Sequence, residues 1–235
     1  MNAPDMGRAY QELGHLSRDT GNEENAIRHY RQACELNPAL KSCWQELYNY
    51  FKRNKNQPAA DHAYMQMNTL ESMPRTLLYI SQILNEGKLG IAEEKCREFL
   101  KKNPTNTFAM SLLSEIADRL GYFDDAEFLL ESAVKLNPND GELRMKFAMI
   151  LRKKQKFSKT MEQINILCEK FPENLSYQAQ KASEVMQNGE HKEAIDLFDE
   201  ILRKNPYNFS ILTSKGHAQK TLGQTDQAIE SYQTA

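Results

Sequence analysis

The stretch GHLSRDTGNEENAIRHYRQA, residues 14–33, returns near the other end of the chain as GHAQKTLGQTDQAIESYQTA, residues 216–235. Seven of the twenty positions are identical, namely Gly, His, Gly, Ala, Ile, Tyr and Ala. Small residues and one aromatic recur here at helical spacings, which is typical of packing positions rather than of catalytic groups. Two copies of one pattern in a single chain indicate an internal repeat.

Columns of like residues show that the repeat runs through the whole sequence. A column of small residues stands at steps of 34 residues with one step of 32: Ala26, Ala60, Ala92, Ala126, Thr160, Ala194 and Ala228. Five residues earlier, five of the seven repeats have Gly, with Lys55 and Gln155 as exceptions among Gly21, Gly87, Gly121, Gly189 and Gly223. Twelve residues later a proline recurs: Pro38, Pro104, Pro138, Pro172 and Pro206. A fixed period of this length is typical of a repeat architecture.

The columns divide the chain into seven repeats within one solenoid, residues 1–235. The predicted repeats are residues 7–40, 41–72, 73–106, 107–140, 141–174, 175–208 and 209–235, the last being incomplete. Apolar residues three and four apart on both sides of each Gly position predict two helices per repeat. Gly ends the first helix in a left-handed conformation, and proline closes the second. The sequence therefore predicts an all-α solenoid.

Two further columns describe the expected packing within each helix pair. Small residues of the first helix are expected to face the column of Ala26: Gly14, Ser114, Ala148, Ala182 and Gly216. An aromatic or branched residue four positions after the small-residue column is expected to fill the space beside that contact: Tyr30, Tyr64, Leu130, Ile164, Phe198 and Tyr232. The second repeat departs from the pattern, because it has Tyr48 at the small position, lacks the Gly and is two residues short. We expect a local change of superhelical pitch near residues 72–74.

The pattern resembles the tetratricopeptide repeat. The first repeat shows the resemblance best, with residues of the expected types at eight positions: Tyr10, Leu13, Gly14, Gly21, Ala26, Tyr30, Ala33 and Pro38. The resemblance implies a right-handed superhelix of helix pairs, in which the first helices line a concave groove. Each repeat would then bury its apolar face only against its neighbours.

Composition and cysteine usage limit the functions that this chain can have. The 235 residues are 40% hydrophobic and 26% charged, with only ten Gly and eight Pro, which favours helices over an all-β fold. A formal charge of −2 predicts neither nucleic acid nor a membrane as the principal partner. Without a long apolar run or a secretory signal, the chain is expected to be cytoplasmic. The scattered cysteines Cys34, Cys43, Cys96 and Cys168 are expected to be reduced packing residues.

No catalytic, cofactor-binding or metal site is predicted. The sequence has no phosphate-binding loop after a strand and no GxSxG or HExxH motif. His15 and Asp19 lie one helical turn apart, but two residues do not make a metal site, and a solvated polar face explains them better.

Binding to a protein or peptide is the remaining expectation, and the groove of the first helices is its predicted place. The predicted binding residues are His15, Arg18, Asn49, Lys52, Met145, Met149, Arg152, His217 and Lys220. Leu77, Leu84 and Met186 would add apolar pockets, the alternative being that such residues pack between neighbouring helices. The Lys, Asn and Arg positions of a chaperone-type carboxylate clamp are not matched, and neither is the basic groove of a helical-repeat RNA reader.

Three segments show a narrower resemblance, to the repeats of proteins that carry a further domain after their repeats. Residues 12–47, 84–130 and 216–235 look like the repeat region of bacterial proteins that have a C-terminal sulfotransferase domain. The resemblance implies that these residues are a substrate-binding or dimerisation arm, and that the cofactor PAPS would bind only to a domain absent from this chain. The alternative is a stand-alone scaffold. Because the sequence stops inside a second helix, we expect that end to be a cut edge, and a homodimer through the solenoid ends is a further expectation.

Overall fold

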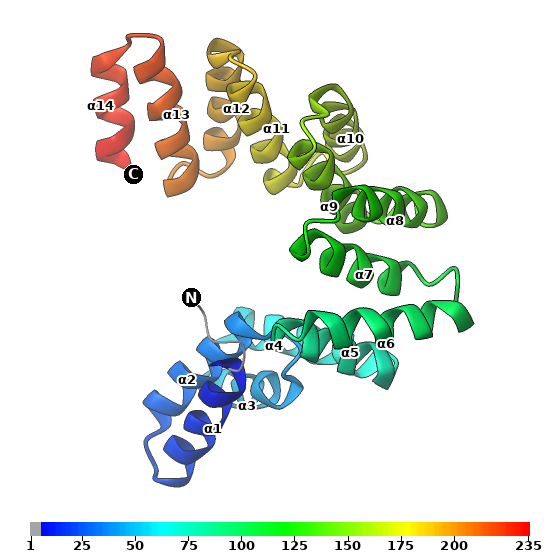
Figure 1. The fold of residues 1–235 in the computed structure, drawn as a ribbon. Coiled ribbons are helices and arrows are strands. Elements are labelled where there is room, and N and C mark those ends of the chain that lie inside the picture. Colours follow the sequence, from blue (N-terminus) through cyan, green and yellow to red (C-terminus); the bar gives the residue numbers. More distant parts are fainter. Residues whose placement is uncertain (1–5) are drawn as a thin grey trace. The chain divides into compact units, whose positions relative to one another are not determined.

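The computed structural model describes residues 6–235, and these form fourteen helices with no strand among them (Figure 1). In chain order the helices are α1 (Met6–Asp19), α2 (Glu23–Leu36), α3 (Lys41–Arg53), α4 (Gln57–Ser72), α5 (Arg75–Asn85), α6 (Leu89–Lys102), α7 (Thr107–Arg119), α8 (Phe123–Leu136), α9 (Gly141–Lys153), α10 (Phe157–Lys170), α11 (Leu175–Gln187), α12 (His191–Lys204), α13 (Phe209–Thr221) and α14 (Thr225–Thr234). The all-α repeat fold is confirmed. The chain divides into two compact units, one up to Leu129 and one from Leu130 to Ala235, and each is described by itself. The single solenoid of residues 1–235 stays a prediction.

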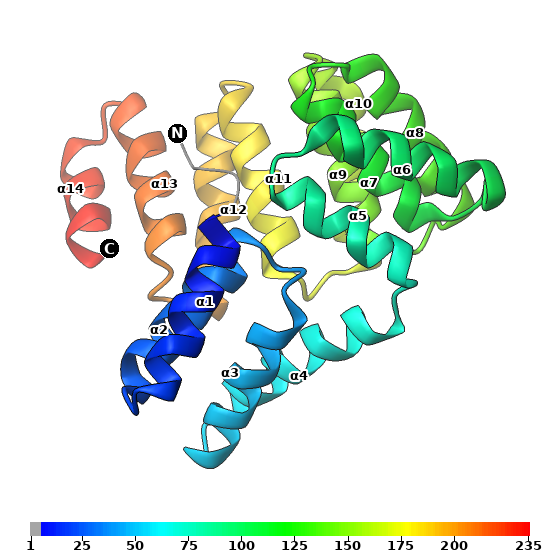
Figure 2. The same cartoon turned by 60° about the horizontal axis from the view of Figure 1, so that its bottom comes forward.

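Consecutive helices pair as antiparallel hairpins, as α1 and α2 or α13 and α14 do (Figure 2). A three-residue turn joins the two helices of each pair, and its central residue has a positive φ. In the first turn, Gly21 N–H donates to Arg18 O at 2.9 Å and Asn22 N–H donates to Ser17 O at 2.8 Å. These two bonds are the Schellman motif, which satisfies carbonyl groups that the helix end would otherwise leave unpaired.

The two repeats without Gly adopt the same turn. Lys55 has φ 56° and Gln155 has φ 58°, close to the left-handed values of the glycines at this position. Their N–H groups donate to Lys52 O at 3.3 Å and to Arg152 O at 2.8 Å. The hairpin geometry thus overrides the local preference of these side chains, for which a left-handed backbone is unfavourable.

An Asn or Asp side chain caps the first helix of each of the last four repeats. The capping residues are Asn106, Asp140, Asn174 and Asn208, each of which accepts a hydrogen bond from a backbone N–H in the first turn. Leu40 and Pro74 stand at this position before α3 and α5 and provide no such bond. Side-chain caps stabilise helix starts by about 1 kcal/mol. The starts of α3 and α5 lack this stabilisation.

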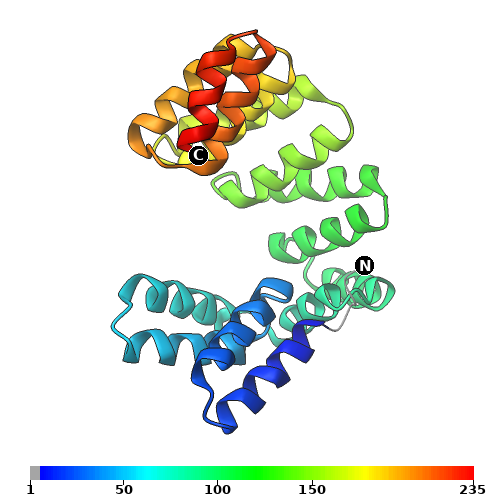
Figure 3. The ribbon, with the colours of Figure 1, turned by 90° about the vertical axis from the view of Figure 1, so that its left-hand side faces the viewer.

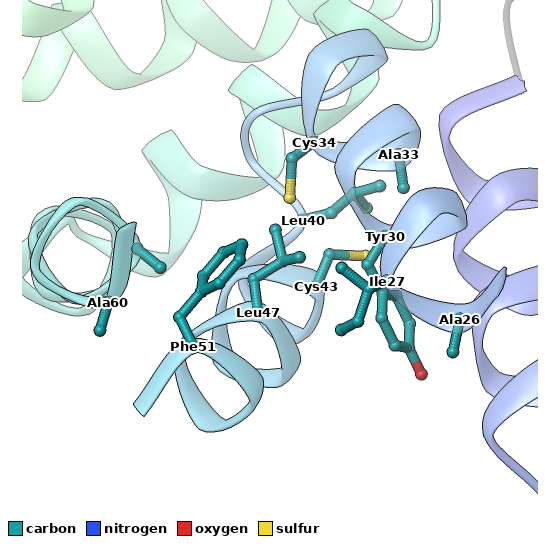
Figure 4. Packing of buried hydrophobic residues seen from close by; sticks show 11 residues of the cluster. Ala26, Ile27, Tyr30, Ala33, Cys34, Leu40, Cys43, Leu47, Phe51 and Ala60 are labelled. Atoms are coloured by element: carbon teal, nitrogen blue, oxygen red, sulfur yellow. The ribbon is translucent and has the colours of Figure 1, made fainter. Parts of the chain in front are cut away.

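The small-residue column lies buried inside the hairpins, from Ala26 at 2% exposure to Ala228 at 3%. The partner position needs a small residue because a Cβ on Gly14 would lie 2.5 Å from the Tyr30 ring. In the first core cluster Tyr30 lies beside Ile27 and near α3 (Figure 4). The predicted close approach of the two helices is therefore present in the first repeat.

Tyr64 is the most exposed member of the aromatic column. Its side chain is 46% exposed, whereas Tyr30, Leu130, Ile164 and Phe198 are buried. The reason is Tyr48, which occupies the small position and packs against Tyr64 with ring centroids 5.5 Å apart. Two tyrosines cannot share the space that Gly14 leaves to one, so Tyr64 lies further out.

The second and third repeats are joined by an unusual connection. Only Met73 and Pro74 link α4 to α5, and both are extended, whereas four residues link α2 to α3 and α6 to α7. Gln82 of α5 also donates from Nε2 to Ala39 O at 3.2 Å. Next to it, Glu86 forms an ion pair with Arg8 of α1. The third repeat thus reaches the first repeat directly, while the change of superhelical pitch expected near residues 72–74 stays a prediction.

The described helices include none that is both long and apolar enough to span a bilayer. Figure 3 shows the hairpins from a second side, with α1 against α2 and α13 against α14.

Candidate functional site

Two predicted binding residues of the N-terminal unit, His15 and Arg18, are held by neighbours. The Nδ1 atom of His15 lies 2.8 Å from the Tyr30 hydroxyl, and the two rings meet edge to face. Arg18 donates from Nη1 to Glu46 Oε1 of α3 at 2.8 Å and also pairs with Asp19. Burial, together with the Glu46 carboxylate, raises the pKa of Tyr30 to about 12. The structure thus uses both residues to connect helices.

Asn49 and Lys52 of α3 are exposed, and Lys52 is held by an aromatic side chain. Lys52 Nζ donates to the Tyr48 hydroxyl at 3.1 Å and lies 5.3 Å from the centre of its ring. Asn49 accepts a hydrogen bond from Gln45 at 3.2 Å. The exposed side of α3 therefore offers one ammonium and one amide group to a partner.

Met145, Met149 and Arg152 lie along α9 in the C-terminal unit. The two methionines are half-buried. Arg152 Nη1 lies 3.0 Å from Glu184 Oε1 of α11, whose side chain is only 5% exposed, and Arg152 also bonds to Gln187. Arg152 stands at the repeat position of Arg18, so both arginines join one first helix to the next. Their charges are already compensated within the protein, which leaves the methionines as the more available groups.

His217 and Lys220 lie on α13 and are exposed. His217 Nδ1 lies 3.0 Å from the Tyr232 hydroxyl, with the ring centroids 5.5 Å apart. This arrangement repeats that of His15 and Tyr30. The histidines are thus parts of the helix pairs as well as surface groups.

Leu77 and Leu84 form no apolar pockets. Both leucines are 1% exposed and belong to one core cluster with Ile80 and Leu113. They pack between helices, as the packing interpretation predicts. Met186 is half-buried and packs against the core of the C-terminal unit.

The sequence analysis did not predict a hollow within the first two repeats. It has a volume of about 330 Å³ and lies between α2, α3 and α4, with Leu47 and Phe51 in its lining. The Arg31 guanidinium lies 5.1 Å from the centre of the Phe51 ring. Trp44 meets His62 edge to face and donates from Nε1 to Pro38 O at 2.8 Å. The signal that points to this place is Trp44, the single tryptophan of the chain.

Residues 6–235 contain no group of three or more His, Cys, Asp or Glu side chains placed to hold a metal ion. The four cysteines are free, and Cys34, Cys43 and Cys96 are buried, as expected of packing residues. Burial raises the pKa of Cys96 to about 11.

Comparisons with known proteins agree with the repeat assignment. The model of the tetratricopeptide repeat matches residues 7–40, 109–140 and 209–235. The matched segments lie in the first, fourth and seventh repeats and include both copies of the opening sequence. Three segments of the chain thus match the tetratricopeptide repeat.

Solved structures of repeat proteins share this fold. A crystal structure of MamA is 17% identical and has a TM-score of 0.59, covering 69% of this chain and 92% of that chain. MamA from Desulfovibrio magneticus RS-1 gives 13% identity, a TM-score of 0.59 and coverage of 69% and 94%. A thermophilic repeat protein of Thermus thermophilus, TTC0263, is 15% identical and has a TM-score of 0.51. The match covers 90% of this chain and 98% of that chain. Comparison with curated protein sequences finds no match. At these identities the likeness concerns the fold.

Proposed function

We propose that this chain is a protein-binding scaffold that takes a peptide or an extended protein segment along its first helices. The observation that carries the proposal is the difference between Met145 and Leu77, which stand at the same repeat position. Leu77 is buried, whereas Met145 is half-buried on α9 next to Met149. Methionine side chains are flexible and polarisable, so they adapt to apolar groups of different shapes. Half-exposed methionines on a rigid helix suit a peptide-binding surface.

The fold and the comparisons support a chain without catalytic activity of its own, since they connect it with repeat proteins. The finer hypothesis, a substrate-binding or dimerisation arm of a PAPS-dependent sulfotransferase, stays a prediction. Neither the matched family nor the similar structures name such a domain. The cytoplasmic location also stays a prediction.

A random peptide library displayed on phage tests the scaffold proposal. Enriched peptides are synthesised, and their affinities for the wild type are measured by fluorescence anisotropy. We expect the double variant Met145→Glu and Met149→Glu to lose at least tenfold in affinity, because the two carboxylates replace the apolar contact. The control is Met65→Glu, since Met65 is 67% exposed on the second helix α4. Equal affinities of wild type and double variant, or no enrichment, would overturn the proposal.

A further inference from the structure

Two cysteines meet where the first repeat packs on the second. Cys34 lies in the last turn of α2 and Cys43 in the first turn of α3. Two repeats further on, Leu100 and Ala109 stand at these positions and share one core cluster. The position is thus a contact between a second helix and the next first helix. Among all such junctions in the sequence, only the first has cysteine at both positions.

The two thiols are free and belong to one core cluster, in which Cys34 is 3% and Cys43 is 0% exposed (Figure 4). The Cys34 S–H donates a hydrogen bond to the Cys43 sulfur, and the Ser42 hydroxyl donates a second one. The bond from Cys34 lowers the pKa of the Cys43 thiol, whereas the same bond and burial raise the pKa of Cys34. The pair therefore loses its first proton from Cys43, while Cys34 stays a thiol.

A surface hollow gives small molecules access to this pair. It is the hollow of about 330 Å³ between α2, α3 and α4, and Cys34 lies in its lining together with Trp44 and Leu47. A water molecule takes up about 30 Å³ in the liquid. Hydrogen peroxide has one oxygen more than water, so it fits into the hollow and can reach the thiols without unfolding of the repeats.

We propose that Cys34 and Cys43 form an oxidation site, at which hydrogen peroxide joins α2 to α3 through a disulfide bond. The Cys43 thiolate attacks one peroxide oxygen, the O–O bond breaks, and the leaving hydroxide takes up a proton to become water. The Cys34 sulfur then attacks the sulfenic acid on Cys43. The S–O bond breaks, the S–S bond forms, and the hydroxyl group leaves with the Cys34 proton as a second water. The two thiols thus lose two electrons, which reduce one peroxide.

The disulfide bond would hold the first two repeats together inside their shared core. In the reduced protein this junction depends on non-covalent packing, and α3 begins without a side-chain cap. A disulfide restricts the unfolded chain and so stabilises the segments that it joins. Local opening of α2 and α3 then becomes rarer. Peroxide would therefore stiffen this end of the scaffold, and the effect needs neither Met145 nor Met149.

Peptide mapping of the full chain measures the reaction. Trypsin cuts after Arg31, Lys41 and Lys52, so each cysteine of the pair lies on its own peptide. After treatment with micromolar hydrogen peroxide and alkylation of the remaining thiols, we expect peptides 32–41 and 42–52 to be linked. In a mixture of isotope-labelled and unlabelled chains, the link should join peptides of the same chain. Links found only between two chains would overturn the proposal.

Cys96 is the matched control within the same molecule. It is also 0% exposed, its thiol donates to Ala109 O at 3.2 Å, and burial raises its pKa to about 11. We expect Cys34 and Cys43 to lose their thiols at least tenfold faster than Cys96, because a thiolate is the group that reacts. Equal rates at the three cysteines would show that the pair has no special reactivity and would overturn the proposal.

Single variants test the roles of the two thiols. In Cys34→Ser the sulfenic acid on Cys43 meets no second thiol, so dimedone, which traps sulfenic acids, labels Cys43. In Cys43→Ser, Cys34 keeps its proton and is labelled at least tenfold more slowly. Equal labelling of the two variants would contradict the proposed order of attack. Circular dichroism verifies that the variants stay helical, and the mapping of the wild type does not depend on them.

Hydrogen exchange measures what the disulfide bond does to the repeats. We expect the amides of α2 and α3 to exchange about tenfold more slowly in the oxidised chain. Dithiothreitol, which reduces the bond, should restore the original rates. Helices α12 and α13 lie in the other compact unit and are the internal control. Unchanged exchange in α2 and α3 after the bond has formed would overturn the proposed stiffening.

Discussion

The hairpins of the first and the seventh repeat have nearly the same sequence pattern but different surroundings. In both, Gly faces a tyrosine ring: a Cβ on Gly14 or on Gly216 would lie 2.5 Å from Tyr30 or Tyr232. In both, a histidine Nδ1 lies next to the hydroxyl of that tyrosine, at 2.8 and 3.0 Å. The two tyrosines differ in how far they are buried, since Tyr30 is 1% exposed and Tyr232 is 37% exposed.

The difference shows which contacts belong to a hairpin and which belong to the stack. The small residues and the His–Tyr pair are formed within one repeat and are present in both hairpins. The burial of Ile27 and Tyr30 comes from the next repeat. In a repeat protein, stability is close to a sum of these two kinds of terms. Comparing the two hairpins therefore separates the stability that comes from within a repeat from the stability that comes from the interface with the next repeat.

The largest effect is expected from truncating the two tyrosines. Tyr30→Ala removes a fully buried aromatic side chain, which costs about 3–5 kcal/mol. Tyr232→Ala costs about 1–2 kcal/mol, because this residue is already 37% exposed in the folded protein. Native-state hydrogen exchange of α2 and α14 amides measures both local losses. Equal losses in the two hairpins would mean that the interface with α3 adds little to the burial of Tyr30.

A smaller effect is expected at high pH. Burial raises the pKa of Tyr30 to about 12, above the value of about 10 in the unfolded chain. The native state then holds its proton more tightly than the unfolded state, so stability falls as the pH rises from 10 to 12. The loss for this one residue is on the order of 2 kcal/mol.

Tyr30→Phe isolates this loss from other groups that titrate in the same range. At pH 8 the variant is less stable than the wild type by about 1 kcal/mol, because the bond to His15 is gone. Between pH 10 and 12 we expect the difference to shrink and reverse, as measured by urea denaturation. Tyr232→Phe is the matched control. A constant difference between wild type and Tyr30→Phe over this range would contradict the raised pKa.

The repeat fold could be predicted because its determinants are local and recur in most of the seven repeats. The Gly of the turn, the small residue of the second helix and the proline each act within a few residues. The same reasoning found the shortened join of the second and third repeats, where the connection is two residues long. Periodicity alone was sufficient for these features.

The site could be predicted less well, because pairing between side chains depends on neighbours that the repeat pattern does not specify. Arg18 and Arg152 remain predicted binding residues, and the repeat pattern does not show that Glu46 and Glu184 of the following first helices compensate their charges. Leu77 and Met145 share a repeat position, and only the structure shows which of them is buried. The hollow beside Trp44 is formed by three helices, so no single repeat contains its signal.

The smallest effect concerns the turns, where the first and seventh repeats have Gly and the second and fifth do not. Lys55 and Gln155 adopt φ values of 56° and 58°, whereas Gly21 and Gly223 have 78° and 76°. A left-handed backbone costs a residue with a Cβ about 1 kcal/mol more than it costs Gly. Part of this gain is offset because Gly makes the unfolded chain more flexible. Lys55→Gly and Gln155→Gly should therefore each stabilise the protein by about 0.5 kcal/mol, measured by urea denaturation.

The reverse substitution completes this test. Gly21→Lys introduces the residue of the second repeat into the first, and open space around Gly21 excludes a steric clash, since no atom lies within 4 Å of an added Cβ. Its cost therefore reports backbone conformation alone, and we expect it to equal the gain from Lys55→Gly with the opposite sign. A Lys55→Gly variant that is less stable than the wild type would show that side-chain contacts of Lys55 outweigh the strain. In that case Lys55 would stabilise the second repeat, although it stands where most other repeats have Gly.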